Sequence, residues 1–229
     1  MSRARALALG LTLSLSHVTV PVAADNVVSH DQDYDYDPPA PGSYTLPVIK
    51  VAPDGAIIDS DSKSLNLGEL THGRVTVLSF IYTRCAAPKA CPYAVGVLSQ
   101  LHALSTDDKE LATNMRLVSL SFDPDYDTPQ RLAQYSEAMR DEKSGCEWHF
   151  ATAKSNAALE SILNGYGQAV DKRSNPNDPQ GPLYHILRVF LIDRAGRIRN
   201  IYSSATLDPR LVRADVKTLL QEERKLSKQ

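Results

Sequence analysis

The chain has 229 residues, of which 25 are basic, 27 are acidic and three are cysteine, and its formal net charge is −2. This length suits one domain with a sizeable core, and the acidic balance excludes the basic surface that nucleic-acid binding requires. No nucleotide-binding glycine loop or Ser-His-Asp arrangement stands out, which argues against phosphoryl transfer and hydrolysis.

The first 24 residues have the pattern of a secretory signal. Arg3 and Arg5 precede an apolar stretch over 6–15, and small residues at 22–24 come directly before Asp25. The apolar stretch is shorter than the roughly 18 to 20 residues that cross a bilayer. We therefore expect residues 1–24 to be removed on export to the periplasm, leaving a soluble protein with 23 basic and 27 acidic residues, a formal charge of −4. An uncleaved signal would instead anchor the chain.

Residues 25–42 are polar, acidic and rich in proline, with an aspartate at every second position from 31 to 37. A segment of this composition buries too little apolar surface to fold by itself, so we expect a disordered tail or linker. The single folded domain is expected over residues 43–229, because no second linker or internal repeat follows.

Within the domain, strands are expected to alternate with helices. The turn sequence Pro53-Asp54-Gly55 predicts a hairpin between two short extended pieces. Runs rich in β-branched and aromatic residues then predict buried strands, at 74–83, 115–123 and 147–153. A helix is expected after each strand, and the first has Ala94, Leu98, Leu101 and Leu104 on its inward face.

The second expected helix begins at Asp127-Thr128-Pro129, and the third covers 156–166. Residues 167–184 form a long polar segment with three prolines, which indicates a functional loop rather than a plain connector. An antiparallel hairpin over 185–203 and a helix capped by Asp208 close the chain. This order predicts a thioredoxin-like α/β sandwich, with a central mixed sheet flanked by helices.

Two cysteines are placed for chemistry. Cys85 follows the first buried strand, and Cys91 directly precedes Pro92 at a helix start, where unpaired N–H groups and the helix dipole favour a thiolate. The pair can form a metal site, a disulfide or a switch between the two. Cys146, just before the third strand, is interpreted as a small buried hydrophobe.

His185 opens the apolar run near the end of the chain. If it begins a strand of the same sheet, its imidazole can approach both thiolates and complete a soft three-ligand site that suits Cu(I) and tolerates Cu(II). A lone histidine before an apolar strand is also a common packing residue, so spacing alone leaves both interpretations open. The other histidines of the domain, His72, His102 and His149, have no ligand spacing with one another.

Three separated motifs resemble the Sco/SenC family of copper-binding proteins. They are YTRC…CP at 82–92, SFDPDYDTP at 121–129 and YHILRVFLID at 184–193, in the order that the family has. The likeness runs from about Pro41 to Leu220. It implies a thioredoxin-like, exported protein that binds copper through two cysteines and a distal histidine, usually to help metallate the binuclear copper centre of cytochrome c oxidase.

Carried onto this sequence, the resemblance places copper ligands at Cys85, Cys91 and His185. Asp123 matches a family position near the site, where it either has a supporting polar role or serves as a turn residue. The spacer departs from the family pattern, with five residues between the cysteines instead of three. Positions six apart on a helix lie about 240° around the axis, so Cys85 must lie in a folded-back loop if both sulfurs hold one ion.

The leading hypothesis is an exported metallochaperone of the Sco/SenC type that delivers copper to a respiratory oxidase or to another exported copper protein. Its partner is then a copper-protein client, and it meets the membrane only through that client or an uncleaved signal. The alternative is a thiol–disulfide oxidoreductase or redox sensor that uses Cys85 and Cys91. A third hypothesis is a docking module with a static disulfide, and whether the chain is an enzyme is left open.

Overall fold

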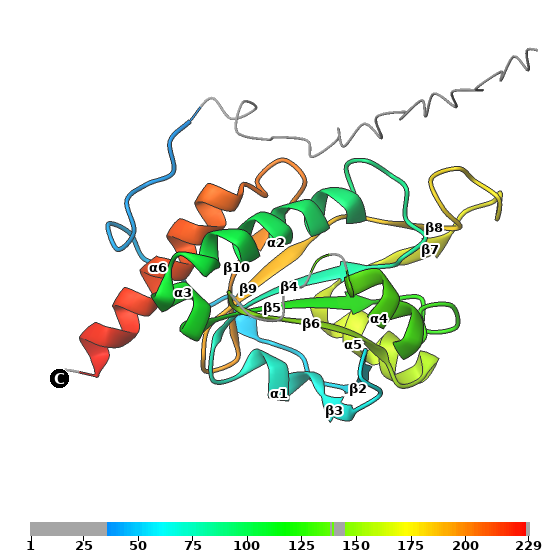
Figure 1. Ribbon diagram of the computed structural model, residues 1–229, viewed down its shortest axis with the longest axis horizontal. Helices are drawn as coiled ribbons and strands as arrows, with labels where there is room; N and C mark the ends of the chain where they lie inside the picture. Colours follow the sequence, from blue (N-terminus) through cyan, green and yellow to red (C-terminus); the bar gives the residue numbers. More distant parts are fainter. Residues whose placement is uncertain (1–35, 138, 140–144, 228–229) are drawn as a thin grey trace, which may run out of the picture. The chain divides into compact units, whose positions relative to one another are not determined.

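The computed structural model describes residues 36–137, 139 and 145–227 (Figure 1). The expected signal at 1–24, and the expected tail up to residue 35, lie outside the described residues. From Tyr36 onward the chain has contacts with the last helix: the Tyr36 carbonyl accepts a hydrogen bond from Arg210, and the Gly42 N–H donates to the Thr218 hydroxyl over 2.9 Å. The domain boundary at residue 43 stays a prediction.

The described residues contain ten strands and six helices. The strands are β1 (Lys50–Val51), β2 (Ala56–Asp59), β3 (Ser64–Asn66), β4 (Val75–Ile81), β5 (Met115–Ser121), β6 (Glu147–Ala153), β7 (Val170–Lys172), β8 (Leu183–His185), β9 (Val189–Ile192) and β10 (Arg197–Tyr202). The helices are α1 (Leu67–Thr71), α2 (Cys91–Thr106), α3 (Lys109–Asn114), α4 (Pro129–Glu137), α5 (Asn156–Tyr166) and α6 (Pro209–Leu226).

Eight strands form one mixed sheet in the order β1-β10-β9-β4-β5-β6-β2-β3. Strands β4, β5 and β6 are parallel, and β9 runs antiparallel to β4. All seven residues of β4 are buried, as expected for a continuous apolar strand at the centre of a sheet. Helices α2 and α6 cover one face, and α4 and α5 cover the other (Figure 1). The predicted α/β sandwich with a central mixed sheet is confirmed.

The hairpin predicted around Pro53-Asp54-Gly55 is wrong. β1 pairs with β10 at one edge of the sheet, whereas β2 pairs with β6 and β3 near the other edge. The turn therefore carries the chain from one edge to the other, and the Asp54 carboxylate accepts hydrogen bonds from the N–H groups of Gly55 and Gly68, each over 2.7 Å. Residues 53–55 do connect two extended pieces, but the strands that flank them pair with strands distant in sequence.

Two further expectations need correction. The segment 167–184 is not a plain loop, because β7 and β8 pair as a separate two-stranded sheet with Val170 opposite His185. His185 therefore ends β8 and does not begin a strand of the central sheet. On α2, Ala94, Leu98 and Leu101 are fully buried as expected, but Leu104 is 41% exposed.

In the part of the chain that the structure describes, no helix is both long enough and apolar enough to cross a membrane.

Candidate metal centre

The two cysteines come from the segment that joins β4 to α2, Cys85 from the loop and Cys91 from the start of the helix. Cys85 is partly exposed in the loop, and its N–H donates to the Tyr82 carbonyl over 3.1 Å. Cys91 is the first residue of α2 and is 1% exposed. A tight turn, in which the Ala90 N–H donates to the Ala87 carbonyl over 3.0 Å, bends the five-residue spacer. The loop thus folds back, and the longer spacer does not separate the sulfurs.

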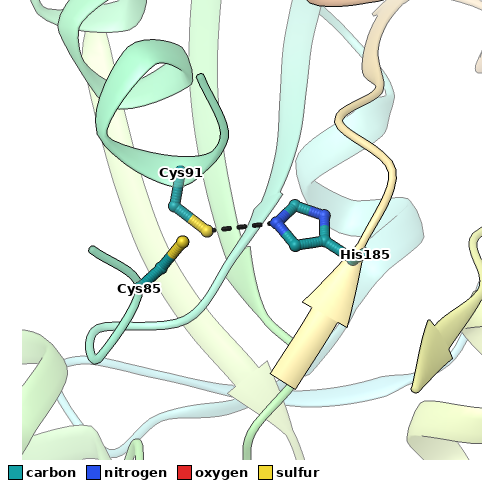
Figure 2. A group of neighbouring side chains, drawn as sticks. All are labelled: Cys85, Cys91 and His185. Carbon is teal, nitrogen blue, oxygen red and sulfur yellow. Dashed lines mark hydrogen bonds between the residues drawn. The ribbon is translucent and has the colours of Figure 1, made fainter. Parts of the chain in front are cut away.

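His185 joins the cysteines from a distant part of the sequence. Its Nε2 lies 3.3 Å from Cys91 Sγ, and the imidazole is 93% buried. Figure 2 shows Cys91 at the helix start, Cys85 on the loop and His185 at the end of β8, with their ligand atoms turned toward one another. The ligand atoms of Cys85, Cys91 and His185 all lie within 4.8 Å of one another. Among the described residues, no other such group of potential metal ligands is found.

Tyr82, directly after β4, positions the strand that carries His185. Its buried hydroxyl donates to the Leu183 carbonyl over 2.9 Å and approaches the Gln180 carbonyl at 3.3 Å. Gly181 has φ +100°, and a Cβ on it would lie 2.3 Å from the Tyr82 oxygen. Only glycine fits both the backbone angle and this approach. The contact holds β8 against the end of β4, and so brings residue 185 to the cysteines.

Aromatic rings surround the His185 imidazole. The ring centroid of Phe122 lies 4.7 Å away and that of Tyr82 lies 6.4 Å away. His185 Nδ1 is buried and has no hydrogen-bond partner among the described residues. In many metal sites a hydrogen bond to the second ring nitrogen fixes the orientation of the imidazole. In this site the packing of aromatic rings and the pairing of β8 with β7 fix the orientation of the His185 imidazole.

The two thiols differ in their electrostatics. A hydrogen bond from the Cys91 thiol is the main cause that lowers the pKa of Cys85 to about 4. Burial raises the pKa of Cys91 above its ordinary value, and the hydrogen bond to Cys85 raises it further. Burial, together with the nearby charge of Cys85, also raises the pKa of Tyr82 to about 12. At neutral pH the metal-free pair therefore shares one proton, with a thiolate at Cys85.

Asp127 is a site-supporting residue that sequence reasoning placed only as a helix start. Its carboxylate is fully buried and accepts hydrogen bonds from the Thr83 N–H over 2.9 Å, from the Thr83 hydroxyl and from the Ser121 hydroxyl over 2.5 Å. It ties the end of β5 to the residues just before Cys85. Asp-Thr-Pro signalled a helix start, but nothing local could show that this carboxylate faces Thr83.

Asp123, expected to support the site, lies in the loop after β5 and pairs with Arg84 at 2.5 Å. It is not in the group that Cys85, Cys91 and His185 form. The supporting role of Asp123 stays a prediction. If Asp123 has this role, it acts through Arg84, the neighbour of Cys85.

Cys146 lies away from the three ligands. It is 2% exposed, and its sulfur is 3.9 Å from Nδ1 of His102 on α2. Burial raises the pKa of this thiol. A protonated thiol in an apolar environment is inert, which agrees with its interpretation as a small buried hydrophobe.

The family model described as SCO1/SenC matches residues 56–221. Copper-bound ScoI of Arabidopsis thaliana is 20% identical with a TM-score of 0.62, over 75% of this chain and 99% of that one. Copper-bound ScoI of Bradyrhizobium japonicum is 20% identical with a TM-score of 0.59, over 74% and 99%. These likenesses show a shared thioredoxin-like fold.

BsSco, described as a member of the Sco family of cytochrome c oxidase assembly proteins with a disulfide switch, is 19% identical to this chain. Its TM-score is 0.57, over 76% of this chain and 98% of that one. No curated protein sequence matches the chain.

The lowered pKa of Cys85 predicts an unusual pH profile of alkylation. In the reduced, metal-free protein, Cys85 stays a thiolate above about pH 4, so its rate with iodoacetamide should be nearly constant from pH 5 to 8. In Cys91→Ala the hydrogen-bond donor is lost, and the profile should move to higher pH. Mass spectrometry of each cysteine follows the reaction. A wild-type rate that rises with a midpoint near pH 8.5, as for an ordinary thiol, would contradict the assignment.

The burial of Asp127 predicts a large loss of stability on its removal. Asp127→Ala removes the buried acceptor of the Thr83 N–H, the Thr83 hydroxyl and the buried Ser121 hydroxyl, and should lower the free energy of unfolding by about 2–4 kcal/mol. Asp123→Ala is the matched control in the same loop, and should cost at most about 1 kcal/mol because its partner Arg84 is exposed. Urea unfolding of the reduced protein measures both. Equal losses in the two variants would show that Asp127 does not hold the loop.

Proposed function

This chain belongs to the SCO1/SenC family, and from that premise we propose that it is an exported copper-binding metallochaperone in which Cys85, Cys91 and His185 hold the ion. The observation that carries the proposal is the convergence of these ligand atoms within 4.8 Å, from a loop, a helix start and a distant strand. Two thiolates and one imidazole are soft and borderline ligands that favour Cu(I). The donor set therefore fits copper as cargo.

The unequal exposure of the two cysteines supports delivery rather than permanent storage. Cys91 and His185 are buried, whereas Cys85 is partly exposed, and Cys85 and His185 line a cavity. An ion held by three ligands keeps room for a fourth. A client thiolate can enter there, displace Cys85 first and then take the ion from the buried pair by stepwise ligand exchange.

The client is proposed to be an exported copper protein. The description of BsSco as a cytochrome c oxidase assembly protein supports an oxidase subunit as that client. The periplasm follows from the secretory pattern of residues 1–24. Asp123 is proposed to support the site indirectly, by holding Arg84 beside Cys85.

A second candidate function is thiol–disulfide exchange. A partly exposed Cys85 next to a buried Cys91 resembles an attacking and a resolving thiol, and this asymmetry favours the candidate. His185 takes no electrons in that chemistry. Reduction of a client disulfide should therefore persist in His185→Ala if exchange is the function, whereas copper binding should not.

Anaerobic titration with Cu(I) against a competing chelator tests the metal site. The reduced wild type should bind one equivalent tightly, and Cys91→Ser and His185→Ala should each weaken binding at least about 100-fold, which corresponds to about 2.7 kcal/mol. Cys146→Ala is the control, since Cys146 lies outside the site, and should bind as the wild type does. If His185→Ala binds Cu(I) as tightly as the wild type, the three-ligand site is wrong.

A further inference from the structure

A cavity of about 520 Å³ opens beside the three ligand side chains, and Cys85 and His185 form part of its wall. We propose that this cavity binds a small anionic thiol, so that copper enters the site as an anionic low-molecular-weight thiolate complex. This inference rests on the proposed copper function and adds to it the chemical form in which the cargo arrives.

The charge of the cavity is the first argument. Lys89 and Arg173 line it, and none of its lining residues is acidic. The chain as a whole has more acidic than basic residues, 27 against 25. The charged side chains of the cavity wall are all basic, so the wall differs in charge from the rest of the chain. A concave wall of one charge raises the local concentration of ligands of opposite charge. The cavity therefore selects anions.

The charges of Lys89 and Arg173 are not fully neutralised by ion pairs. Lys89 is exposed and has no ion-pair partner among residues 36–137, 139 and 145–227. The Arg173 guanidinium donates to the Leu183 carbonyl and the Gln180 side chain, each over 3.3 Å, and Asp178 lies 4.0 Å from it, outside the cavity wall. The ion pair with Asp178 is at the outer limit of such a contact, so part of the Arg173 charge remains for an incoming anion.

The size and lining of the cavity favour a small molecule over a folded partner. A volume of about 520 Å³ lies within the range of roughly 300–1,000 Å³ that is typical of small-ligand sites. Leu183, Ile186 and Leu187 add apolar wall beside the two cations. The arrangement suits a short thiol with a carboxylate, whose sulfur points to Cys85 and whose carboxylate meets the cations.

Transfer from such a complex is a balanced ligand exchange. The Cys85 thiolate bonds to Cu(I) of a bis-thiolate complex and displaces one small thiolate, which leaves as an anion. Cys91 then bonds to the ion, its proton passes to the second small thiolate, and that ligand leaves as a neutral thiol. His185 completes the site. Copper stays Cu(I) throughout, so no oxidant or reductant is consumed.

Stopped-flow loading of the reduced, metal-free full chain tests the proposal. Cu(I) is supplied either as its complex with glutathione, a thiol with carboxylates, or as its complex with 2-mercaptoethanol, which has no carboxylate and whose bis-thiolate complex carries only a single negative charge. At low salt, Lys89→Gln and Arg173→Gln should each slow loading from the glutathione complex at least about threefold, and should slow loading from the less charged 2-mercaptoethanol complex clearly less. Arg173→Lys should restore the rate. Lys154→Gln, an exposed lysine outside the cavity, is the matched control.

Calorimetry of the metal-free protein with S-methylglutathione gives a readout without copper. Saturable binding to the wild type and to Cys91→Ser, in which the changed residue does not line the cavity, is the expected result, with binding lost in the double variant Lys89→Gln with Arg173→Gln. Absent binding, or loading rates that are equal for all variants, would overturn the inference while leaving copper affinity intact.

The opposite pattern, binding of S-methylglutathione without tight Cu(I) binding, would reject the metallochaperone function and keep the anion-binding cavity. If the two cations affect only transfer to a client protein, they recognise a macromolecule and the inference is wrong.

Discussion

The hydrogen bond from the Tyr82 hydroxyl to the Leu183 carbonyl joins the two halves of the candidate metal centre. Tyr82 directly follows β4, three residues before Cys85, and Leu183 lies two residues before His185. Gly181 permits the close approach, because any Cβ at that position would collide with the tyrosine. Asp127 holds the same segment through Thr83, whose N–H donates to its carboxylate. The central strand thus sets the position of both the cysteine loop and the small β7–β8 sheet.

This arrangement separates holding from exchange. Cys91 and His185 are buried, and the Phe122 ring packs on the imidazole, so these two ligands have little contact with water. Cys85 faces the cavity whose other walls carry Lys89 and Arg173. Because the exposed sulfur has the lowered pKa, the more reactive ligand is the one that a partner can reach. One side of the site favours affinity and the other favours transfer, which is the combination that a carrier of copper needs.

Much of this could be predicted from the sequence. β6 and α5 begin and end where their patterns predict, and the buried β4 lies at the sheet centre, because apolar periodicity and turn residues are local signals. Cys85, Cys91 and His185 were identified through motif resemblance. The strand of His185, the buried Asp127 carboxylate and the separation of β1 from β2 were missed, because each depends on a partner distant in sequence. The path of the five-residue spacer could not be predicted either, because the Ala86 N–H donates to the carbonyl of Gln180, a residue distant in sequence.

The most direct measurement is X-ray absorption at the copper edge of the protein loaded with one equivalent of Cu(I). The account predicts a three-coordinate ion with two sulfur ligands and one nitrogen ligand, and loss of the imidazole scattering in His185→Ala with both sulfurs retained. A spectrum with two sulfurs alone in the wild type, identical to that of His185→Ala, would contradict the Cys85, Cys91 and His185 site.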